Sequence, residues 1–197
     1  FNLYLQAFYQ LGMAGLGKHH SRFRIREVLN TRRERLVWGD QVDMRRYEIR
    51  TMRDYITYRR KRLREKTGLW TITFLTPLCM KHQKNFLRDF SGEAVVKGAA
   101  RRMQMLNYYT GTEAMLPDFP RFPQTVTQFV RTEQVERYSG TQDSHMTLRG
   151  ITGRAVMKEI PEECMDYLIA GELTQIGKNT SFGFGKYILG RGEGEQD

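Results

Sequence analysis

The chain has 197 residues and carries 32 Lys and Arg side chains against 22 Asp and Glu, a formal net charge of +10. A chain of this length can bury roughly 70% of its unfolded surface, which argues against disorder, and its apolar runs are shorter than the ~20 residues of a membrane-spanning helix. Two cysteines without framework spacing, and the lack of a signal peptide, indicate a cytoplasmic protein.

Residues 1–50 are predicted to be the end of a first domain whose beginning is absent. Tyr4, Phe8 and Leu11 have helical spacing, a glycine-rich turn follows, and residues 23–28 alternate like a strand. The turn continues as GKHHS, and a second glycine-rich segment 160 positions later reads GKNTS. The order of helix, glycine-rich turn and strand therefore occurs near both ends of the chain. This indicates one unit used twice, with a chance match as the alternative.

Residues 51–66 are predicted to be a basic linker or helix. Residues 22–66 contain 16 Lys or Arg, of which 14 are Arg, against 7 Asp or Glu. Such an uneven field attracts polyanions, and the planar arginine fork suits phosphate contact. RNA or another nucleic acid is therefore the expected partner, and the alternative is a solvated helix face. The predicted contacts in this segment are Arg59, Arg60, Arg62 and Arg64.

Residues 67–197 are predicted to form a whole second domain. Apolar residues that alternate indicate strands, and apolar residues three or four apart indicate helices. The expected elements are a strand at 70–77, a helix at 91–109, strands at 126–138 and 146–160, a helix at 161–176 stopped by Gly177, and a strand at 182–189. This order predicts an α+β fold of tandem ferredoxin-like domains of the RNA-recognition type, the first one incomplete.

A glycine-rich segment follows the second helix of this domain and reads IGKNTSFGFGKY at residues 176–187. Glycines allow close backbone approach and expose amide donors that can hold a phosphate, while two lysines supply charge. The alternative is a helix cap at Gly177 with close packing of Gly183 and Gly185. The predicted RNA-binding residues of this segment are Gly177, Lys178, Asn179, Thr180, Ser181, Gly183, Gly185 and Lys186.

The glycine-rich segment resembles that of the CRISPR-associated endoribonucleases that cut repeat RNA, within the repeat-associated mysterious protein superfamily. The resemblance extends to FLTPL at residues 74–78, GITG at residues 150–153 and AGLG at residues 14–17. It implies two ferredoxin-like domains, a basic cleft for CRISPR repeat RNA, and cleavage without metal or cofactor that leaves a 2′,3′-cyclic phosphate. The alternative is a non-catalytic RNA-binding subunit of a CRISPR effector complex, and a general RNA-binding module is a third class.

Cleavage of this kind needs a general base and a general acid, and histidine is the natural proton carrier. His19 and His20 follow the first glycine-rich turn and are the predicted catalytic residues, whereas His82 and His145 are weaker candidates. The resemblance also implies a catalytic histidine in the early part of the first domain, which is absent here. No acidic cluster has metal-site spacing, and Cys79 with His82 is only half of a zinc site, so no metal is expected.

Overall fold

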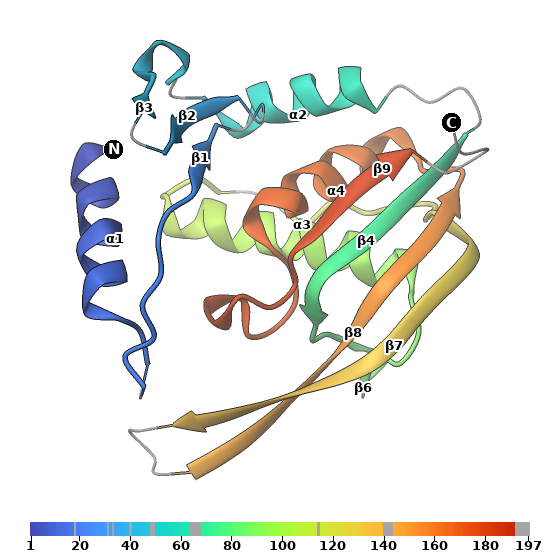
Figure 1. Ribbon diagram of the computed structural model, residues 1–197. Helices are drawn as coiled ribbons and strands as arrows, with labels where there is room; N and C mark the ends of the chain where they lie inside the picture. The colour runs from blue at the N-terminus through green and yellow to red at the C-terminus, as the bar shows by residue number, and fades with distance from the viewer. Residues whose placement is uncertain are drawn as a thin grey trace. The chain divides into compact units, whose positions relative to one another are not determined.

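The computed structural model describes residues 1–17, 19–30, 32, 34–39, 41–47, 50–63, 68–113, 115–139 and 144–191. The chain folds into two compact units, Phe1–Tyr55 and Ile56–Asp197, and each contains an antiparallel sheet (Figure 1). Helix α2, Met52–Arg62, begins in the first unit and ends in the second. No helix within the described ranges is both long enough and apolar enough to cross a bilayer.

The first unit contains one long helix and a small sheet. Its elements are α1, Asn2–Ala14, β1, Glu27–Leu29, β2, Arg35–Trp38, β3, Gln41–Val42, and η1, Met44–Arg46. The three strands pair antiparallel in the order β1-β2-β3. The strand predicted at residues 23–28 is shorter than expected. Phe23 lies against α1 instead, because its N–H donates to the Gly12 carbonyl at 3.2 Å.

The second unit contains a four-stranded sheet and two helices in the predicted order. Its main elements are β4, Leu69–Leu78, α3, Gly92–Tyr109, β7, Gln124–Ser139, β8, Ser144–Lys158, α4, Glu162–Thr174, and β9, Tyr187–Arg191. The sheet is antiparallel with the strand order β7-β8-β4-β9, and its connectivity is the ferredoxin-like one. A small hairpin of β5, Lys81–His82, and β6, Asn85–Phe86, follows β4.

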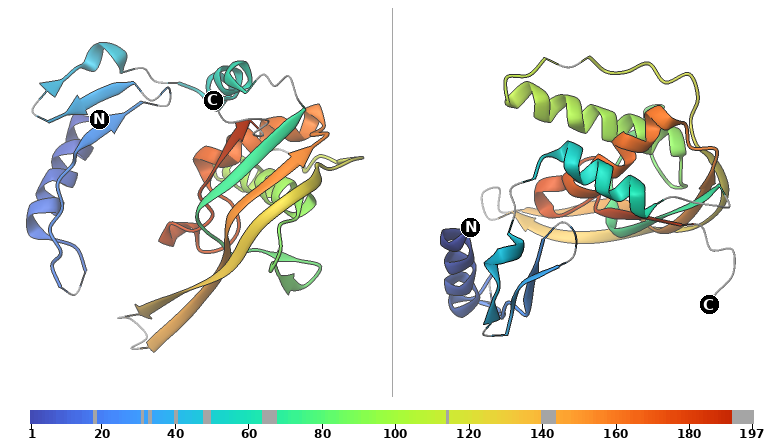
Figure 2. Two further views of the ribbon diagram at one scale, coloured as in Figure 1. Left: turned by 45° about the vertical axis from the view of Figure 1, so that its right-hand side comes forward. Right: turned by 90° about the horizontal axis from the view of Figure 1, so that it is seen from above.

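Helices α3 and α4 cover the same face of the four-stranded sheet (Figure 2). Ile72 of β4 is paired with Ala155 of β8, and both are fully buried, as are Val95 of α3 and Leu168 of α4. Burial of an isoleucine, valine or leucine side chain, as at Ile72, Val95 and Leu168, stabilises the fold by about 1.5–3 kcal/mol. Side chains at the alternate positions of the strands point to the opposite face. No helix among the described residues of this unit covers that face.

Helix α4 ends before the glycine that was predicted to stop it. Gln175 has a φ of 57°, which lies outside the helical region, and its N–H makes the last bond back to the helix, to Gly171. Ile176 leaves the helix because its N–H donates to the Gly185 carbonyl at 3.2 Å. The helix predicted at residues 161–176 is therefore shorter than expected, and its last two predicted residues belong to the loop that follows.

The β7–β8 hairpin extends past the four-stranded sheet (Figure 1). Strand β8 pairs with β4 only as far as Ile151, but it pairs with β7 as far as Ser144. The outer part, which we call the ribbon (residues 133–139 and 144–150), thus has only two strands, an arrangement that is marginally stable alone in water. Val135 supports it by packing against a buried cluster that includes Leu148 and Phe184.

The second half of α2 is held in the second unit by an ion pair between the half-buried Arg59 and the buried Glu172. The Nε and Nη2 atoms of Arg59 donate to the two carboxylate oxygens of Glu172 at 2.8 and 2.7 Å, and Nη2 also donates to the Leu189 carbonyl at 2.8 Å. The Glu172 side chain is 4% exposed and accepts the Leu189 N–H at 2.7 Å as well. One carboxylate therefore joins α2, α4 and β9.

The remaining arginines predicted to bind RNA have different surroundings. Arg60 forms ion pairs with Asp166 and Glu162 on α4, and Arg62 is exposed. Arg64 lies outside the described residues. RNA contact by the four predicted arginines of this segment stays a prediction, although two of them already have carboxylate partners.

Replacing Arg59 with alanine should lower the free energy of unfolding by about 3 kcal/mol, because the buried Glu172 carboxylate loses its charged partner. Urea unfolding followed by circular dichroism measures this change. Lys61→Ala is the matched control, since Lys61 is an exposed cation on the same helix and its loss should change stability by less than about 0.5 kcal/mol. Equal stability of the two variants would contradict the fastening role of Arg59.

Candidate functional site

The loop between α4 and β9, residues 175–186, lies along the end of β4 and is called the glycine-rich loop below. Lys178 donates its backbone N–H to the Cys79 carbonyl at 2.7 Å, and Gly185 donates to the Pro77 carbonyl at 2.9 Å. One end of the loop is thus bonded to β4, which carries the FLTPL segment, and the other end to the residue that directly follows β4. The middle of the loop projects from these two anchors.

Two glycines of the loop are required by close packing, and a third is required only by its backbone conformation. A Cβ atom at Gly177 would lie 2.5 Å from the Cys79 carbonyl oxygen, and one at Gly185 would overlap the Ile176 carbonyl oxygen. A Cβ atom at Gly183 would meet nothing within 4 Å, although its φ of 85° favours glycine. The packing interpretation therefore applies to Gly177 and Gly185, but not to Gly183.

Some backbone amides of the loop are open to a ligand. Internal hydrogen bonds use the N–H groups at both anchors and those of residues 182–184. In the part of the chain that the structure describes, the N–H groups of Asn179, Thr180 and Ser181 have no hydrogen-bond partner. They lie at the beginning of the short helix η2, Thr180–Phe182. The amides of these three positions, all of which are predicted to bind RNA, are therefore available to a ligand.

The two lysines of the loop differ in what their ammonium groups contact. Lys186 donates to the Glu172 carbonyl at 2.5 Å, so its charge is used inside the unit. Lys178 is exposed, and its Nζ lies 5.9 Å from the ring centroid of Phe86 in the β5–β6 hairpin. Lys178 is therefore the lysine of this loop that presents its charge to solvent.

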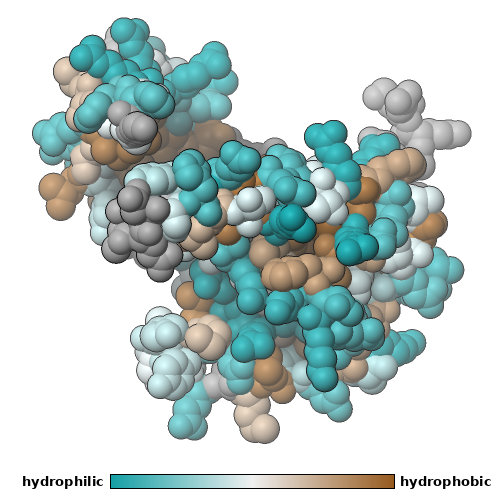
Figure 3. Space-filling view, turned by 90° about the horizontal axis from the view of Figure 1, so that it is seen from below, coloured by the Kyte–Doolittle hydropathy of each residue, from teal (hydrophilic) through white to brown (hydrophobic). Residues whose placement is uncertain are grey.

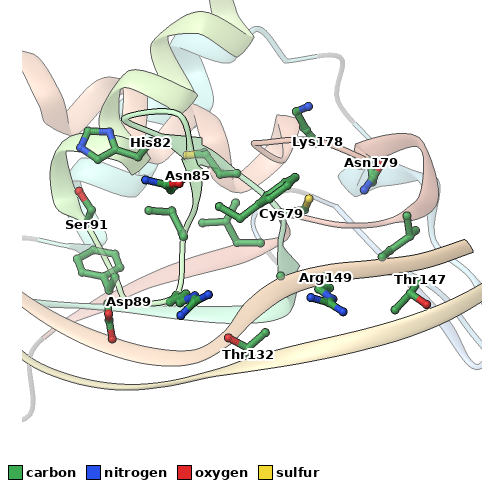
Figure 4. Close-up of a pocket in the computed structure, with 18 residues that line it drawn as sticks. Cys79, His82, Asn85, Asp89, Ser91, Thr132, Thr147, Arg149, Lys178 and Asn179 are labelled. Atoms are coloured by element: carbon green, nitrogen blue, oxygen red, sulfur yellow. The ribbon is translucent and has the colours of Figure 1, made fainter.

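A cavity of about 890 Å³ lies beside the glycine-rich loop, and the β5–β6 hairpin and the ribbon line it as well (Figure 4). Its lining contains the cations Arg88, Arg149 and Lys178, and Asp89 is the one carboxylate among the described lining residues. This excess of positive charge suits a phosphate group. The lining also contains neutral polar side chains: Asn85, Ser91, Thr132, Thr147 and Asn179.

The ribbon and the glycine-rich loop are connected by a cation–π contact. The guanidinium carbon of Arg137 lies 3.8 Å from the ring centroid of Phe182, whose side chain is 45% exposed. A contact of this geometry is favourable even at an exposed site, by about 0.5–1 kcal/mol. The contact therefore holds together two elements that both contribute residues to the cavity lining, although Arg137 and Phe182 are not lining residues themselves.

His82, a weaker catalytic candidate from its sequence position, also lines the cavity. His82 places Nε2 3.7 Å from the carboxylate of Glu93. Lys97 donates to the same carboxylate at 2.6 Å, and mainly this bond, with help from His82, holds the pKa of Glu93 below its ordinary value. The feature of the sequence that could have indicated His82 is its position four residues after the FLTPL segment.

The predicted catalytic pair lies in the first unit. His19 and His20 are exposed in the turn between α1 and β1, which an isolated bridge between Leu16 and Ser21 closes. Lys18, their neighbour in sequence, lies outside the described residues. The cavity belongs wholly to the second unit, so the sequence prediction and the cavity give two separate sets of candidate proton carriers.

The two cysteines are poor nucleophiles in this fold. Burial raises the pKa of the Cys79 thiol, and the nearby Lys178 charge only partly opposes this effect. Burial also raises the pKa of Cys164 to about 11. Both thiols are therefore protonated near neutral pH. In the described ranges no three His, Cys, Asp or Glu side chains are grouped closely enough to hold a metal ion.

The chain matches a protein-family model over part of its length. The family model for the CRISPR-associated endoribonuclease Cas6 matches residues 72–187, which is more than half of the chain and includes most of β4, all of α3, β7, β8 and α4, and the glycine-rich loop. No curated protein sequence is similar enough to this chain to count as a relative.

Solved structures with a similar fold include chains of larger assemblies. A partial Cas6-RT-Cas1–Cas2 complex contains a chain that is 13% identical, with a TM-score of 0.51 over 74% of this chain and 26% of that chain. In a second Cas6-RT-Cas1–Cas2 complex the values are the same, except that 16% of that chain is covered. A Cas6 of Thermus thermophilus is 14% identical, with a TM-score of 0.45 over 67% of this chain and 57% of that chain. The present chain thus spans only a minor part of the first two neighbours, and likeness at this identity concerns the fold alone.

Gly185→Ala should unfold or severely destabilise the protein, because the new methyl group overlaps the Ile176 carbonyl in a loop fixed at both ends. Gly183→Ala is the matched control: its φ is almost the same, but its surroundings are open, so we expect a loss of only about 1–2 kcal/mol. Thermal unfolding of the two purified variants measures the difference. Similar melting temperatures would show that backbone conformation alone, and not packing, selects glycine at both positions.

Proposed function

The chain belongs to the CRISPR-associated endoribonuclease family Cas6, and we propose that it binds the repeat RNA of CRISPR transcripts and cuts it. The observation that carries this proposal is the family match over residues 72–187, together with the basic cavity beside the glycine-rich loop. Family membership also excludes the third class considered from the sequence, a general RNA-binding module unrelated to CRISPR.

We further propose that the chain has two ferredoxin-like domains, of which residues 1–50 form the end of the first. Residues 51–66 connect it to the second, which comprises residues 67–197. The antiparallel sheet and the helix of the first unit support this proposal, because a helix, a glycine-rich turn and a strand also follow one another around the loop of the second unit.

The cavity is proposed to hold RNA phosphate. Lys178 and Arg149 supply charge from the glycine-rich loop and from β8, and the open amides of residues 179–181 are donors of the kind that bind phosphate oxygens. The exposed ring of Phe86 lies beside Lys178, so a base next to the bound phosphate can stack there. Phosphate contact, base stacking and hydrogen bonding would then come from one small area.

The proposed reaction is an attack by a ribose 2′-hydroxyl on the adjacent phosphorus, which expels the 5′-oxygen and leaves a 2′,3′-cyclic phosphate. A general base removes the proton of the 2′-hydroxyl, and a general acid protonates the leaving oxygen. His19 and His20 are the proposed proton carriers, and the side chains of Lys178 and Arg149 stabilise the charge that develops on the phosphate. The reaction needs no metal or cofactor in this proposal.

Lys178→Ala and Arg149→Ala should each weaken binding of labelled CRISPR repeat RNA, by an amount equivalent to about 1.5–3 kcal/mol, without a large loss of fold stability. Each variant should also reduce the slope of log affinity against log salt by roughly 0.7–0.9, because one phosphate contact is lost. Filter binding at several salt concentrations measures both quantities. Arg101→Ala is the matched control, since it removes an exposed cation from α3. An unchanged slope in both cavity variants would remove the cavity from the RNA path.

The protein should cleave labelled repeat RNA in the presence of EDTA, and phosphatase-resistant 3′ ends should identify the cyclic phosphate.

Replacing both His19 and His20 with alanine should slow single-turnover cleavage by about 100-fold or more while RNA affinity stays near that of the parent. His145→Ala on the ribbon is the control. A chain that binds repeat RNA tightly but never cuts it would favour the alternative, a non-catalytic subunit of an effector complex. Slow cleavage by His82→Ala alone would move the proton-transfer role to the cavity.

A further inference from the structure

The two edge strands of the four-stranded sheet differ in what their outward main-chain groups contact. On β9, the Leu189 N–H donates to Glu172 at 2.7 Å and the Leu189 carbonyl accepts from Arg59 at 2.8 Å, so side chains occupy this edge. The opposite edge strand, β7, has 16 residues and pairs only with β8 (Figure 1). In the described part of the chain, the main-chain groups of residues 127–137 have no hydrogen-bond partner other than β8.

The outer edge of β7 is long and lacks the usual protection against strand pairing. In an antiparallel ladder, alternate residues direct their N–H and C=O groups away from the partner strand. Soluble proteins commonly protect such an edge with proline, with lysine or with a covering element. Residues 124–139 contain neither proline nor lysine, and their pairing with β8 is regular from Thr127 onward. This edge can therefore accept a further strand.

The charges of β7 are complementary to those of a second copy of the same strand. When two copies pair antiparallel about Thr132, residues 127–137 of one lie opposite residues 137–127 of the other, and Arg131 lies opposite Glu133 twice. Opposite charges that face each other across two strands are favourable, and like charges are unfavourable. Centring the pair one residue away, on Arg131 or on Glu133, would place that residue opposite its own copy. The charges thus select the register centred on Thr132.

The other pairs of this register are compatible as well. Phe129, whose side chain is 66% exposed, lies opposite Val135, and pairs of an aromatic with a β-branched residue stabilise sheets. The remaining charges of the range, Glu136 and Arg137, lie opposite neutral residues. Hydrophobic and hydrophilic residues are mixed on the face that Figure 3 shows. Strand pairing does not need a large apolar patch, because main-chain hydrogen bonds supply much of its affinity.

We propose that β7 pairs with β7 of a second copy of this chain, antiparallel about a two-fold axis at Thr132. The two four-stranded sheets then form one continuous sheet across the interface. Because the axis is perpendicular to the sheet, α3 and α4 of both copies lie on the same face and do not obstruct the pairing. An extended segment of another protein would also find main-chain partners at this edge, but it would not explain why the charges of β7 match each other.

The first test measures the dimer dissociation constant of the whole chain by sedimentation equilibrium, without RNA. Arg131→Glu should weaken the dimer about five- to 100-fold, because two attractive pairs become two repulsive ones, and Glu133→Arg should do the same. The double variant, which exchanges the two charges, should restore the parental value. On β8 the partners of these residues are Thr152 and Gly150, so the exchange breaks no ion pair between the two strands. Arg101→Glu, an equal change of charge on the exposed side of α3, is the matched control and should leave the dimer unchanged.

The second test locates the two-fold axis by cross-linking. In Thr132→Cys, the two new thiols lie directly opposite each other, so a short bismaleimide should join the copies rapidly. Thr127→Cys is the control on the same strand, because its copies would lie ten positions apart, roughly 30 Å, in the proposed register. The native Cys79 and Cys164 are buried and should react slowly with the reagent.

Three results would overturn this interface. The first is a parent chain that stays monomeric at every concentration reached, which would leave the edge to a different partner. The second is a dimer that Arg131→Glu does not weaken more than Arg101→Glu, or that the charge exchange does not restore. The third is equal cross-linking of Thr132→Cys and Thr127→Cys. Neither test contains RNA, so their failure would leave the proposed cleavage of repeat RNA intact, and failure of cleavage would leave this interface intact.

Discussion

A single buried carboxylate fastens together the parts of the second unit that carry the candidate site. Glu172 of α4 binds the guanidinium of Arg59 and the N–H of Leu189, while its own carbonyl accepts a hydrogen bond from Lys186. Burying a charge costs several kcal/mol unless these groups compensate it. Together these bonds fix the positions of the second half of α2, of α4, of β9 and of the end of the glycine-rich loop relative to one another. Loss of any one partner leaves a polar group buried without compensation.

The glycine-rich loop shows how packing and binding depend on each other. Gly177 and Gly185 allow the backbone to lie against β4, and this contact uses the amides at both ends of the loop. In the segment between them, the amides of residues 179–181 have no hydrogen-bond partner among the described residues. The two interpretations of the glycines, as packing devices and as parts of a phosphate site, therefore apply to different residues of one loop.

The cations of the second unit also fall into two groups, one that stabilises the fold and one that is available for binding. Arg59, Arg60 and Lys186 neutralise carboxylates or cap carbonyls inside the unit, where they stabilise the fold. Lys178 and Arg149 are left at the cavity, where a polyanion can reach them. Net charge alone cannot separate these uses, because an arginine in sequence gives no sign of whether a carboxylate more than 100 positions away will meet it.

The sequence by itself determined the order of elements in the second unit. Strands and helices that bury one face keep their apolar residues at a regular spacing, and this spacing can be recognised locally in the chain. It also determined the family, since the segment at residues 176–187 and the FLTPL segment are continuous in the chain. Only the tertiary structure decided that Arg59 serves Glu172, that His82 lines a cavity with Lys178, and that Phe129 lies beside Arg154. Each of these relations joins residues that are distant in sequence. Their proximity follows from strand register and helix packing, which local patterns do not contain.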